Sequence, residues 1–262
     1  MNENRTLLAI FAHPDDETFR CGGTLALLSA RGVRVYLMTA TRGEAGSAGD
    51  PPLCGPEELA EWRERELRCA CRALGLEPPR FLDYRDGHLA EADPEQVIER
   101  IVRAVRELRP QVMLTYGPDG ISGHPDHVAI GRLATEAFYR AAEASVFPHH
   151  SAQGLAPHAV AKLYQLAVPR SLAERLGLGQ VRSVPDEEIT LAVDVAPAWK
   201  AKMEAIRCHA TQLGVTPILK APVERQRLFL GTETFRLAFS RVELVERERD
   251  MFDGLHKVFT SS

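Results

Sequence analysis

Short apolar runs alternate with longer amphipathic segments through the first half of the chain, and this order most constrains the fold. The predicted strands cover residues 7–12, 33–39, 80–82 and 112–116. Segments 22–31, 67–74, 97–108 and 128–138 follow them with apolar residues at helical spacing. Strands joined through helices pair in parallel and leave the helices on the two faces of the sheet. The order therefore predicts an α/β fold, Rossmann-like, with a mostly parallel sheet and helices on both faces.

The second half continues the pattern less regularly. Further strands are predicted at residues 162–168, 189–195 and 235–239, and a helix is predicted over 197–213. Residues 144–161 are rich in Ala, His, Pro and Ser, which favours an inserted or irregular loop. Because the chain shows neither an internal repeat nor a clear linker, we expect residues 1–262 to form a single domain.

The charge balance argues against several classes of partner. The chain carries a formal net charge of −4, with acidic and basic residues interleaved. Neither nucleic acid nor an anionic membrane surface is an expected partner of such a chain. Its apolar runs are too short to cross a bilayer or to form the core of a signal peptide, so we expect a cytoplasmic protein.

The five cysteines are Cys21, Cys54, Cys69, Cys71 and Cys208. Their number is odd and no pair has the Cys-x-x-Cys spacing, which together favour reduced thiols over a disulfide framework. Cys69 and Cys71 lie two residues apart in a predicted helix, so their side chains are expected to point in different directions.

Two polar blocks follow predicted strands: His13-Pro14-Asp15-Asp16-Glu17 and His124-Pro125-Asp126-His127. In an open parallel sheet, ligands bind beyond the carboxyl ends of the strands, which is where both blocks are expected. A neutral imidazole and a carboxylate are suitable donors for a zinc-type ion. Either block alone would also serve as a helix cap. However, carboxylates crowded beside a histidine repel one another unless a cation lies among them, which favours a metal site.

Several motifs together resemble the PIG-L (LmbE-like) family of zinc-dependent N-acetylglucosaminyl de-N-acetylases. Besides the two polar blocks, the similar segments are residues 22–24, 41–46, 63–75, 86–87, 209–212 and 231–233. The resemblance is strong over residues 7–133 and weaker after residue 191. It implies a Rossmann-like fold and removal of an acetyl group from an N-acetylglucosaminyl compound, for example the precursor of a low-molecular-weight thiol.

The resemblance also implies roles for individual residues. It gives three metal ligands, which are His13, Asp16 and His127. Asp15 is the implied general base, and His124 is the implied cationic partner of the oxyanion or the leaving amine, oriented by Asp126. Some relatives carry a tyrosine two residues before the second block, where this chain has Ser122. The oxyanion would then rely more on the metal and on His124. The expected ion is zinc, although two histidines and one carboxylate also suit Fe(II).

Three further residues are the predicted sugar contacts: Glu44, Arg63 and Asp86. An arginine fork and carboxylates suit a substrate that is rich in hydroxyl groups. The same residues would otherwise form an ion pair on a helix face and ordinary loop contacts. The expected partner is therefore a small glycoside substrate, and the sequence leaves a homo-oligomer open.

Two other functions compete with deacetylation. An amidase that cleaves a larger amide, such as that of a thiol conjugate, would differ only in its pocket. A non-catalytic nucleotide-binding Rossmann module would need a Gly-x-Gly-x-x-Gly fingerprint after the first strand. That place is occupied by the acidic block that begins at His13, whose charge opposes a pyrophosphate. The sequence therefore favours a metal-dependent hydrolase.

Overall fold

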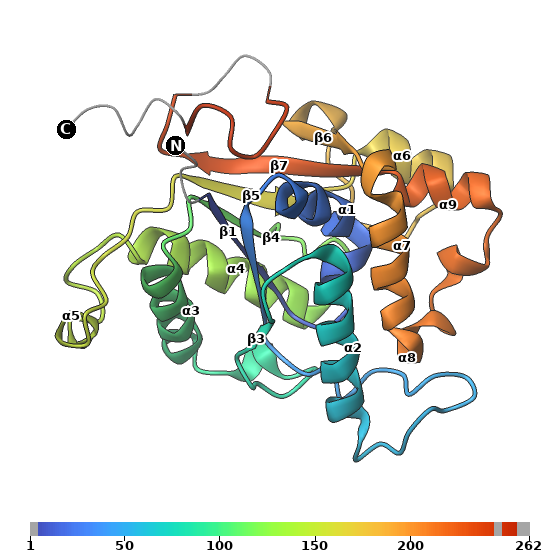
Figure 1. Cartoon of the computed structure of the whole chain (residues 1–262), viewed down its shortest axis with the longest axis horizontal. Helices are drawn as coiled ribbons and strands as arrows, with labels where there is room; N and C mark the ends of the chain where they lie inside the picture. The colour runs from blue at the N-terminus through green and yellow to red at the C-terminus, as the bar shows by residue number, and fades with distance from the viewer. Residues whose placement is uncertain (1–4, 244–247, 256–262) are drawn as a thin grey trace.

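One mixed sheet organises the residues that the computed structural model describes, which are 5–243 and 248–255 (Figure 1). Within these ranges the sheet has seven strands in the order β3-β2-β1-β4-β5-β7-β6. The strands are β1 (Thr6–Phe11), β2 (Arg34–Thr39), β3 (Arg80–Phe81), β4 (Val112–Tyr116), β5 (Lys162–Leu166), β6 (Leu191–Asp194) and β7 (Thr232–Ser240). The first five run parallel to one another, and β7 pairs antiparallel with both β5 and β6. The sheet is therefore mostly parallel, as predicted.

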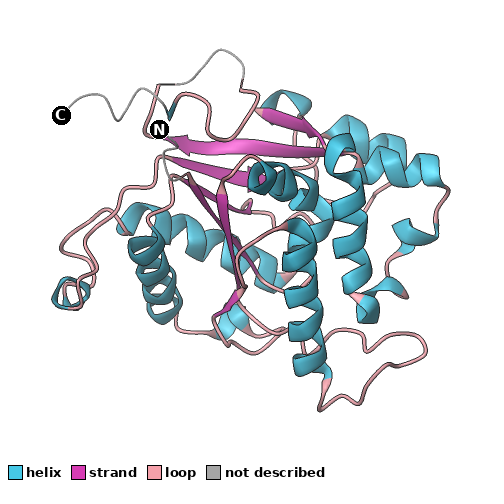
Figure 2. Ribbon diagram, in the orientation of Figure 1, coloured by secondary structure: helices cyan, strands magenta, loops and turns pink. Residues whose placement is uncertain are grey.

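Helices cover both faces of this sheet (Figures 1 and 2). One face carries α1 (Asp16–Ala30), α2 (Leu59–Leu74) and α7 (Trp199–Cys208), which pack on one another. The other carries α3 (Pro94–Leu108) and α4 (Pro125–Arg140), which also pack together. The smaller helices are α5 (His149–Ala152), α6 (Arg170–Leu176), α8 (Ala210–Leu213) and α9 (Val223–Leu230). Short 3-10 turns cover Leu89–Glu91, Asp186–Glu188, Ala196–Ala198 and Pro217–Lys220. The predicted α/β fold with helices on both faces is confirmed.

The continuous apolar runs form the central strands because both faces of the sheet are covered. All six residues of β1 and all five of β4 are buried, and β4 is a direct neighbour of β1. A strand covered on both sides needs apolar residues without alternation. The pairing of β1 with β4 also brings the two polar blocks that follow these strands to one edge of the sheet. Within the described ranges, no helix has the length and apolar character needed to cross a membrane.

The first helix begins at Asp16 and not at residue 22, where apolar periodicity predicted its start. Its first turn holds Asp16 and Glu17, which are acidic and yet buried. Carboxylates are favoured near the positive end of a helix dipole. A pattern that seeks apolar residues misses a first turn whose buried side chains are polar. The first polar block is thus partly the start of a helix inside the protein.

The predicted helix over residues 197–213 is interrupted at His209, which separates α7 from α8. The backbone of His209 leaves the helical region (φ −82°, ψ 57°), and its buried ring lies 2.8 Å from the Glu17 carboxylate. A charge-assisted hydrogen bond of this kind can compensate for the helical hydrogen bonds lost at the break. The predicted loop over residues 144–161 is irregular except for α5 and a few turns.

Cys69 and Cys208 form a disulfide, so the prediction of reduced thiols is wrong for this pair. Cys69 lies on α2 and Cys208 ends α7, and their α-carbons are 5.7 Å apart although 139 positions separate them in the chain. Sequence spacing could not indicate this pair, because only the packing of α2 against α7 brings the two side chains together. Cys21, Cys54 and Cys71 are free.

Replacing Cys208 with serine should lower the free energy of unfolding by about 2–4 kcal/mol, because a disulfide restricts the unfolded chain. Denaturant unfolding of the oxidised wild type, the reduced wild type and Cys208→Ser measures the effect. Cys54→Ser is the matched control, since Cys54 is half-buried and unpaired, and it should unfold like the wild type. Equal midpoints for the oxidised wild type and Cys208→Ser would show that the disulfide contributes nothing to stability.

Candidate active site

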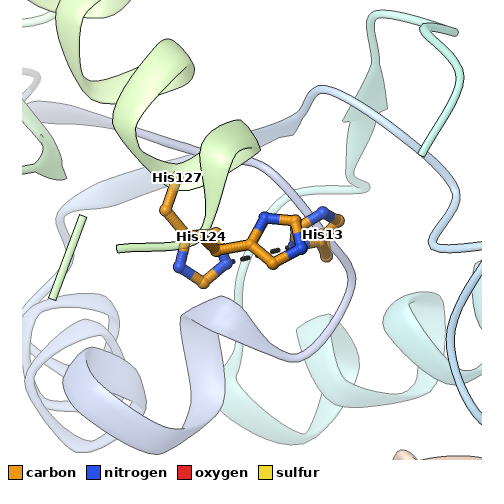
Figure 3. Close-up of side chains that lie close together, drawn as sticks. All are labelled: His13, His124 and His127. Atoms are coloured by element: carbon orange, nitrogen blue, oxygen red, sulfur yellow. Dashed lines mark hydrogen bonds between the residues drawn. The ribbon is translucent and has the colours of Figure 1, made fainter. Parts of the chain in front are cut away.

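Three histidines meet at the carboxyl edge of the sheet (Figure 3). His13 follows β1, His124 caps the start of α4, and His127 lies in the first turn of that helix. The ring centroid of His13 lies 4.9 Å from that of His124 and 5.1 Å from that of His127. Although His13 and His127 are 114 positions apart in the chain, the two polar blocks contribute to one site.

Hydrogen bonds around His13 leave Nδ1 as the nitrogen that can bind an ion. Its Nε2 lies 2.9 Å from Oδ1 of Asp86 and 3.3 Å from Oδ2 of Asp126. An ionised carboxylate can only accept, so Nε2 carries the proton and Nδ1 of the neutral ring keeps its lone pair. A histidine whose far nitrogen donates to a carboxylate is the usual arrangement of a metal ligand.

His127 is oriented in a similar way by the loop before α4. Its Nδ1 lies 3.2 Å from the carbonyl oxygen of Gly120, which can only accept, and 3.2 Å from Oγ of Ser122. The lone pair of the neutral ring is then on Nε2, which lies 3.1 Å from Nδ1 of His13. The face of the His127 ring stacks on the ring of Tyr116, with ring centroids 4.3 Å apart. Two lone pairs that face each other at such a distance repel unless a proton or a cation lies between them.

Asp16 completes this group of ligand atoms. Its Oδ2 accepts hydrogen bonds from the backbone N–H groups of Ala12 and His13. Its Oδ1 lies 3.3 Å from Nε2 of His127, and its Oδ2 lies 3.8 Å from Nδ1 of His13. Ligand atoms around a tetrahedral zinc ion, with bonds of about 2 Å, lie about 3.3 Å from one another. Nδ1 of His13 and Oδ1 of Asp16 both lie near this distance from Nε2 of His127, which suits a shared ion, while Asp16 approaches His13 through its other oxygen.

Two overlapping groups of potential ligands lie in the same region. Atoms of His13, His124 and His127 lie within 4.8 Å of one another, as do atoms of His13, Asp86 and Asp126. In the second group, both carboxylates approach Nε2 of His13, which carries the proton. The geometry therefore suits Asp86 and Asp126 as partners of a ligand better than as ligands. His124 offers a further donor on the exposed side.

The electrostatics of the site favour a bound cation. Burial disfavours the imidazolium of His13, but the carboxylates of Asp126 and Asp86 outweigh burial and raise its pKa to about 10. Burial likewise opposes a charge on His127, yet Asp16 raises the pKa of that ring. The surrounding carboxylates thus favour a positive charge on both imidazoles. Their facing nitrogens, Nδ1 of His13 and Nε2 of His127, lie only 3.1 Å apart, so protons on both would repel each other. One divalent ion satisfies both rings.

Metal affinity should therefore rise with pH. In the metal-free protein, the pKa of about 10 keeps His13 protonated on Nδ1 at neutral pH, so an ion must displace that proton. Each displaced proton should raise the apparent affinity about tenfold per pH unit, from about pH 6 to about pH 8. Competition titrations against a zinc chelator at several pH values measure this slope. A flat profile would mean that His13 is unprotonated before the metal binds.

Asp15 precedes α1 in an unusual backbone conformation. Its φ of 105° lies in the left-handed region, which residues with a β-carbon rarely adopt. The carboxylate accepts a 3.2 Å hydrogen bond from Nη2 of Arg63. The same guanidinium donates to the carbonyl oxygens of Pro14 and Gly43. Burial raises the pKa of Asp15 to about 6, against the opposing charge of Arg63. A carboxylate that titrates near neutrality is suited to general base catalysis.

His124 differs from the prediction of a cationic group. Burial and the neighbouring charges of His13 and His127 lower the pKa of His124, so its neutral form is favoured. Its Nδ1 accepts a hydrogen bond from the backbone N–H of Asp126, which leaves the ring proton on Nε2. His124 can therefore donate a hydrogen bond as a neutral group. The physical reasons are burial and two adjacent imidazoles that compete with His124 for positive charge.

Asp126 contacts both rings, His124 through its backbone N–H and His13 through its carboxylate. Its oxygens accept hydrogen bonds from the backbone N–H groups of Gly87 and Leu89 and from the ring of His13. Burial opposes ionisation of Asp126, but these donors outweigh burial and lower its pKa. The side chain is fully buried. Asp126 is thus an ionised carboxylate that holds one imidazole in place.

The three predicted sugar contacts lie near one another and take part in internal hydrogen bonds. Asp86 accepts from the backbone N–H of Ala45, and Oε1 of Glu44 accepts from the backbone N–H of Asp86. Arg63 holds the Asp15 segment. Among the residues that the structure describes, Oε2 of Glu44 is buried without a hydrogen-bond partner. This oxygen is therefore the unused acceptor of the group.

Three residues around the site received no individual role from the sequence. Tyr116 stacks on His127. Because it is the last residue of an apolar strand, the sequence pattern predicts only a core position for it. Glu17 and His209 form a buried pair 2.8 Å apart behind Asp15. Burial opposes the charged form of His209, yet Glu17 raises its pKa. The motif at residues 209–212 was visible in the sequence, but its position beside the first polar block depends on the fold.

The fold and the site together define an α/β protein with a candidate metal centre at the carboxyl edge of its sheet. The family model PIG-L, described as GlcNAc-PI de-N-acetylase, matches residues 8–138 of the chain. Relatives of this class align over nearly the whole sequence. The chain belongs to the PIG-L family, as its motifs predicted.

Two curated relatives and one solved structure illustrate the similarity. The 1D-myo-inositol 2-acetamido-2-deoxy-alpha-D-glucopyranoside deacetylase of Kineococcus radiotolerans is 37% identical, with 97% of this chain and 84% of the relative covered. The protein of the same name from Streptomyces griseus is 36% identical, with 96% and 89% covered. The N,N'-diacetylchitobiose deacetylase from Pyrococcus horikoshii has a TM-score of 0.71 at 23% identity, with 90% of this chain and 84% of that chain covered. This last similarity supports the fold alone.

Proposed function

We propose that this protein is a metal-dependent deacetylase that removes the acetyl group from an N-acetylglucosaminyl compound whose sugar is linked to a polyol such as inositol. One observation carries the proposal. Nε2 of His127 lies 3.1 Å from Nδ1 of His13 and 3.3 Å from Oδ1 of Asp16, distances suited to ligands of one divalent ion. The named activity of the relatives on 1D-myo-inositol 2-acetamido-2-deoxy-alpha-D-glucopyranoside supports the substrate class.

His13, Asp16 and His127 would hold the ion, and zinc is the first candidate because it prefers such nitrogen and oxygen donors. When bound, the ion supplies Lewis-acid chemistry for the acetyl carbonyl. Asp86 and Asp126 keep His13 in the tautomer that can bind it. A set of three protein ligands leaves room for substrate, which is typical of a catalytic site.

Asp15 would act as the general base. With a pKa of about 6, it can take a proton from the attacking water near neutral pH and return one to the departing amine. The hydrogen bond from Arg63 restrains the direction of the carboxylate. The neutral His124 would donate from Nε2 to the oxyanion that forms on the acetyl oxygen.

Glu44, Arg63 and Asp86 would line the sugar side of the site. Oε2 of Glu44 lacks a hydrogen-bond partner among the described residues and is buried. A buried acceptor without a partner is unfavourable, so a hydroxyl of the substrate is the group expected to pair with it. Arg63 and Asp86 would contribute mainly by holding Asp15 and His13 in position.

Deacetylation assays on zinc-loaded protein test the proposal. The substrates are 1D-myo-inositol 2-acetamido-2-deoxy-alpha-D-glucopyranoside, N,N'-diacetylchitobiose and N-acetylglucosamine, with the amide of a larger thiol conjugate as a comparator. Acetate and free amine should appear together, depend on the metal and form fastest from the inositol glycoside. Turnover of the thiol conjugate alone would favour an amidase. Failure of fully loaded protein to deacetylate any sugar would overturn the proposal.

A further inference from the structure

The backbone of Asp15 is held in its unusual conformation by the turn that follows it. Its φ of 105° lies in a region that favours glycine, so surrounding contacts must maintain it. The N–H of Asp15 donates to Oε2 of Glu17 at 3.0 Å. The carbonyl oxygen of Asp15 accepts from the N–H and the Oγ1 of Thr18, at 3.0 and 2.8 Å. Both peptide groups that flank Asp15 are therefore fixed by α1.

Glu17 is in turn held by a residue from the far end of the chain. The side chain of Glu17 is 1% exposed and that of His209 is 0% exposed. Nε2 of His209 lies 2.8 Å from Oε1 of Glu17, across a separation of 192 positions in the sequence. A buried carboxylate is unfavourable unless it is paired. Without His209, Glu17 would therefore be driven to leave its place beside the Asp15 peptide group.

The main chain departs from a regular helix at His209, where this contact is made. His209 interrupts what would otherwise be one helix from α7 to α8, and α7 packs directly on α1. Arg63 restrains the carboxylate of Asp15 from α2. The candidate base is thus supported on its backbone by Glu17 and on its side chain by Arg63.

Resting on the function proposed above, we propose that Glu17 and His209 are positioning residues that hold Asp15 in its left-handed conformation and so direct the base toward the reacting amide. Neither residue belongs to the proposed ligand set of His13, Asp16 and His127. Their loss should therefore displace the base while the metal stays bound.

Kinetics of matched variants test this role. Glu17→Met keeps roughly the size of the side chain and removes both carboxylate oxygens, and His209→Leu removes the imidazole donor. Both variants should lower kcat by about 10- to 100-fold, because a displacement of about 1 Å is enough for such a loss, while KM changes by less than about threefold. Elemental analysis should give the same metal content as in the wild type.

Glu233→Met provides a control, because Glu233 contacts the same helix from β7. The Glu233 carboxylate is also buried, accepts from the backbone N–H groups of Gly23 and Thr24, and pairs with Lys202. It thus supports α1 further from Asp15. This variant should unfold at lower denaturant concentration but keep the wild-type kcat. An equal loss of kcat in Glu233→Met and Glu17→Met would overturn the inference, because general support of α1 would then explain both.

A double variant asks whether Glu17 acts through Asp15. If it does, adding Glu17→Met to Asp15→Asn should lower kcat no further, since the base is already gone. Multiplication of the two effects would contradict the positioning role. His209→Leu should behave like Glu17→Met in the same background, because the two residues form one chain of contacts to Asp15.

Crystal structures of the zinc-loaded wild type and of Glu17→Met give a readout that does not depend on the substrate. The variant should show Asp15 outside the left-handed region or turned away from Arg63. An unchanged Asp15 would overturn the positioning role even where deacetylation is confirmed. If the wild type deacetylates no sugar but the variant shows Asp15 displaced, the proposed function fails and the positioning role stands.

Discussion

Alanine in place of His13, Asp16 or His127 should remove the bound metal and abolish deacetylation in each variant. Nε2 of His127 lies 3.1 Å from Nδ1 of His13 and 3.3 Å from Oδ1 of Asp16, so the loss of one ligand leaves only two donors for the ion. Two donors make a weak site, because structural and catalytic zinc sites use at least three protein ligands. Elemental analysis of the purified variants, together with kcat for the inositol glycoside, measures both effects.

Conservative substitutions of the carboxylates that hydrogen-bond to His13 distinguish metal ligands from the residues that support them. Loss of a supporting carboxylate changes metal affinity by about 10- to 100-fold, so Asp86→Asn and Asp126→Asn should regain the ion at higher metal concentration. His158→Ala is the control, because His158 contacts the carbonyl oxygen of Pro110 before the start of β4 and not at the site. Full metal content in one of the alanine variants would remove that residue from the ligand set.

Asp15→Asn should lower kcat by about 10²- to 10⁴-fold, the usual contribution of a general base, while the metal content stays at the wild-type level. The oxygen of asparagine can still accept a hydrogen bond from Arg63, so the variant removes the base and little else. Asp16 keeps its position beside His127, which is why the ion should remain. Measurements of kcat, KM and zinc content on the same preparation test this expectation.

The pH profile gives a second check on the base. A carboxylate with a pKa of about 6 is ionised above that pH and protonated below it. A divalent cation bound beside Asp16 favours the carboxylate form of Asp15, so with saturating metal kcat/KM of the wild type should fall as the pH drops below about 6. This limb should be absent from the residual activity of Asp15→Asn. Asp83→Asn, which changes an exposed carboxylate paired with Arg42, should keep the wild-type profile. Loss of metal from Asp15→Asn would mean that the roles of Asp15 and Asp16 were exchanged.

Strands in the middle of the sheet could be predicted closely because they are covered on both faces. The strand Val112–Tyr116 has the predicted bounds, since a short apolar run between Pro110 and Gly117 allows few other structures. The same reasoning failed where polar side chains are buried. It placed the start of the first helix after Asp16 and Glu17. It also predicted one continuous helix up to Leu213, whereas the structure breaks this helix at His209.

The site could be located from the sequence because parallel strands end at one edge of a sheet. His13 and His127 follow neighbouring strands, so their approach required only the predicted α/β topology. The charge of His124 could not be obtained in this way. Its pKa depends on two imidazoles within 5.0 Å of its ring centroid, and their distance is a property of the folded chain.

Residue types and their places after strands determined by themselves that this chain carries a nitrogen- and oxygen-donor site on an α/β sheet. Only the tertiary structure decided which groups support it: Asp126 holds His13, His209 reaches Glu17, and Cys69 pairs with Cys208. The physical reason is one of range. Periodicity and strand order follow from neighbours in the sequence, whereas a hydrogen bond needs its two atoms about 3 Å apart. Packing of distant helices alone sets such distances.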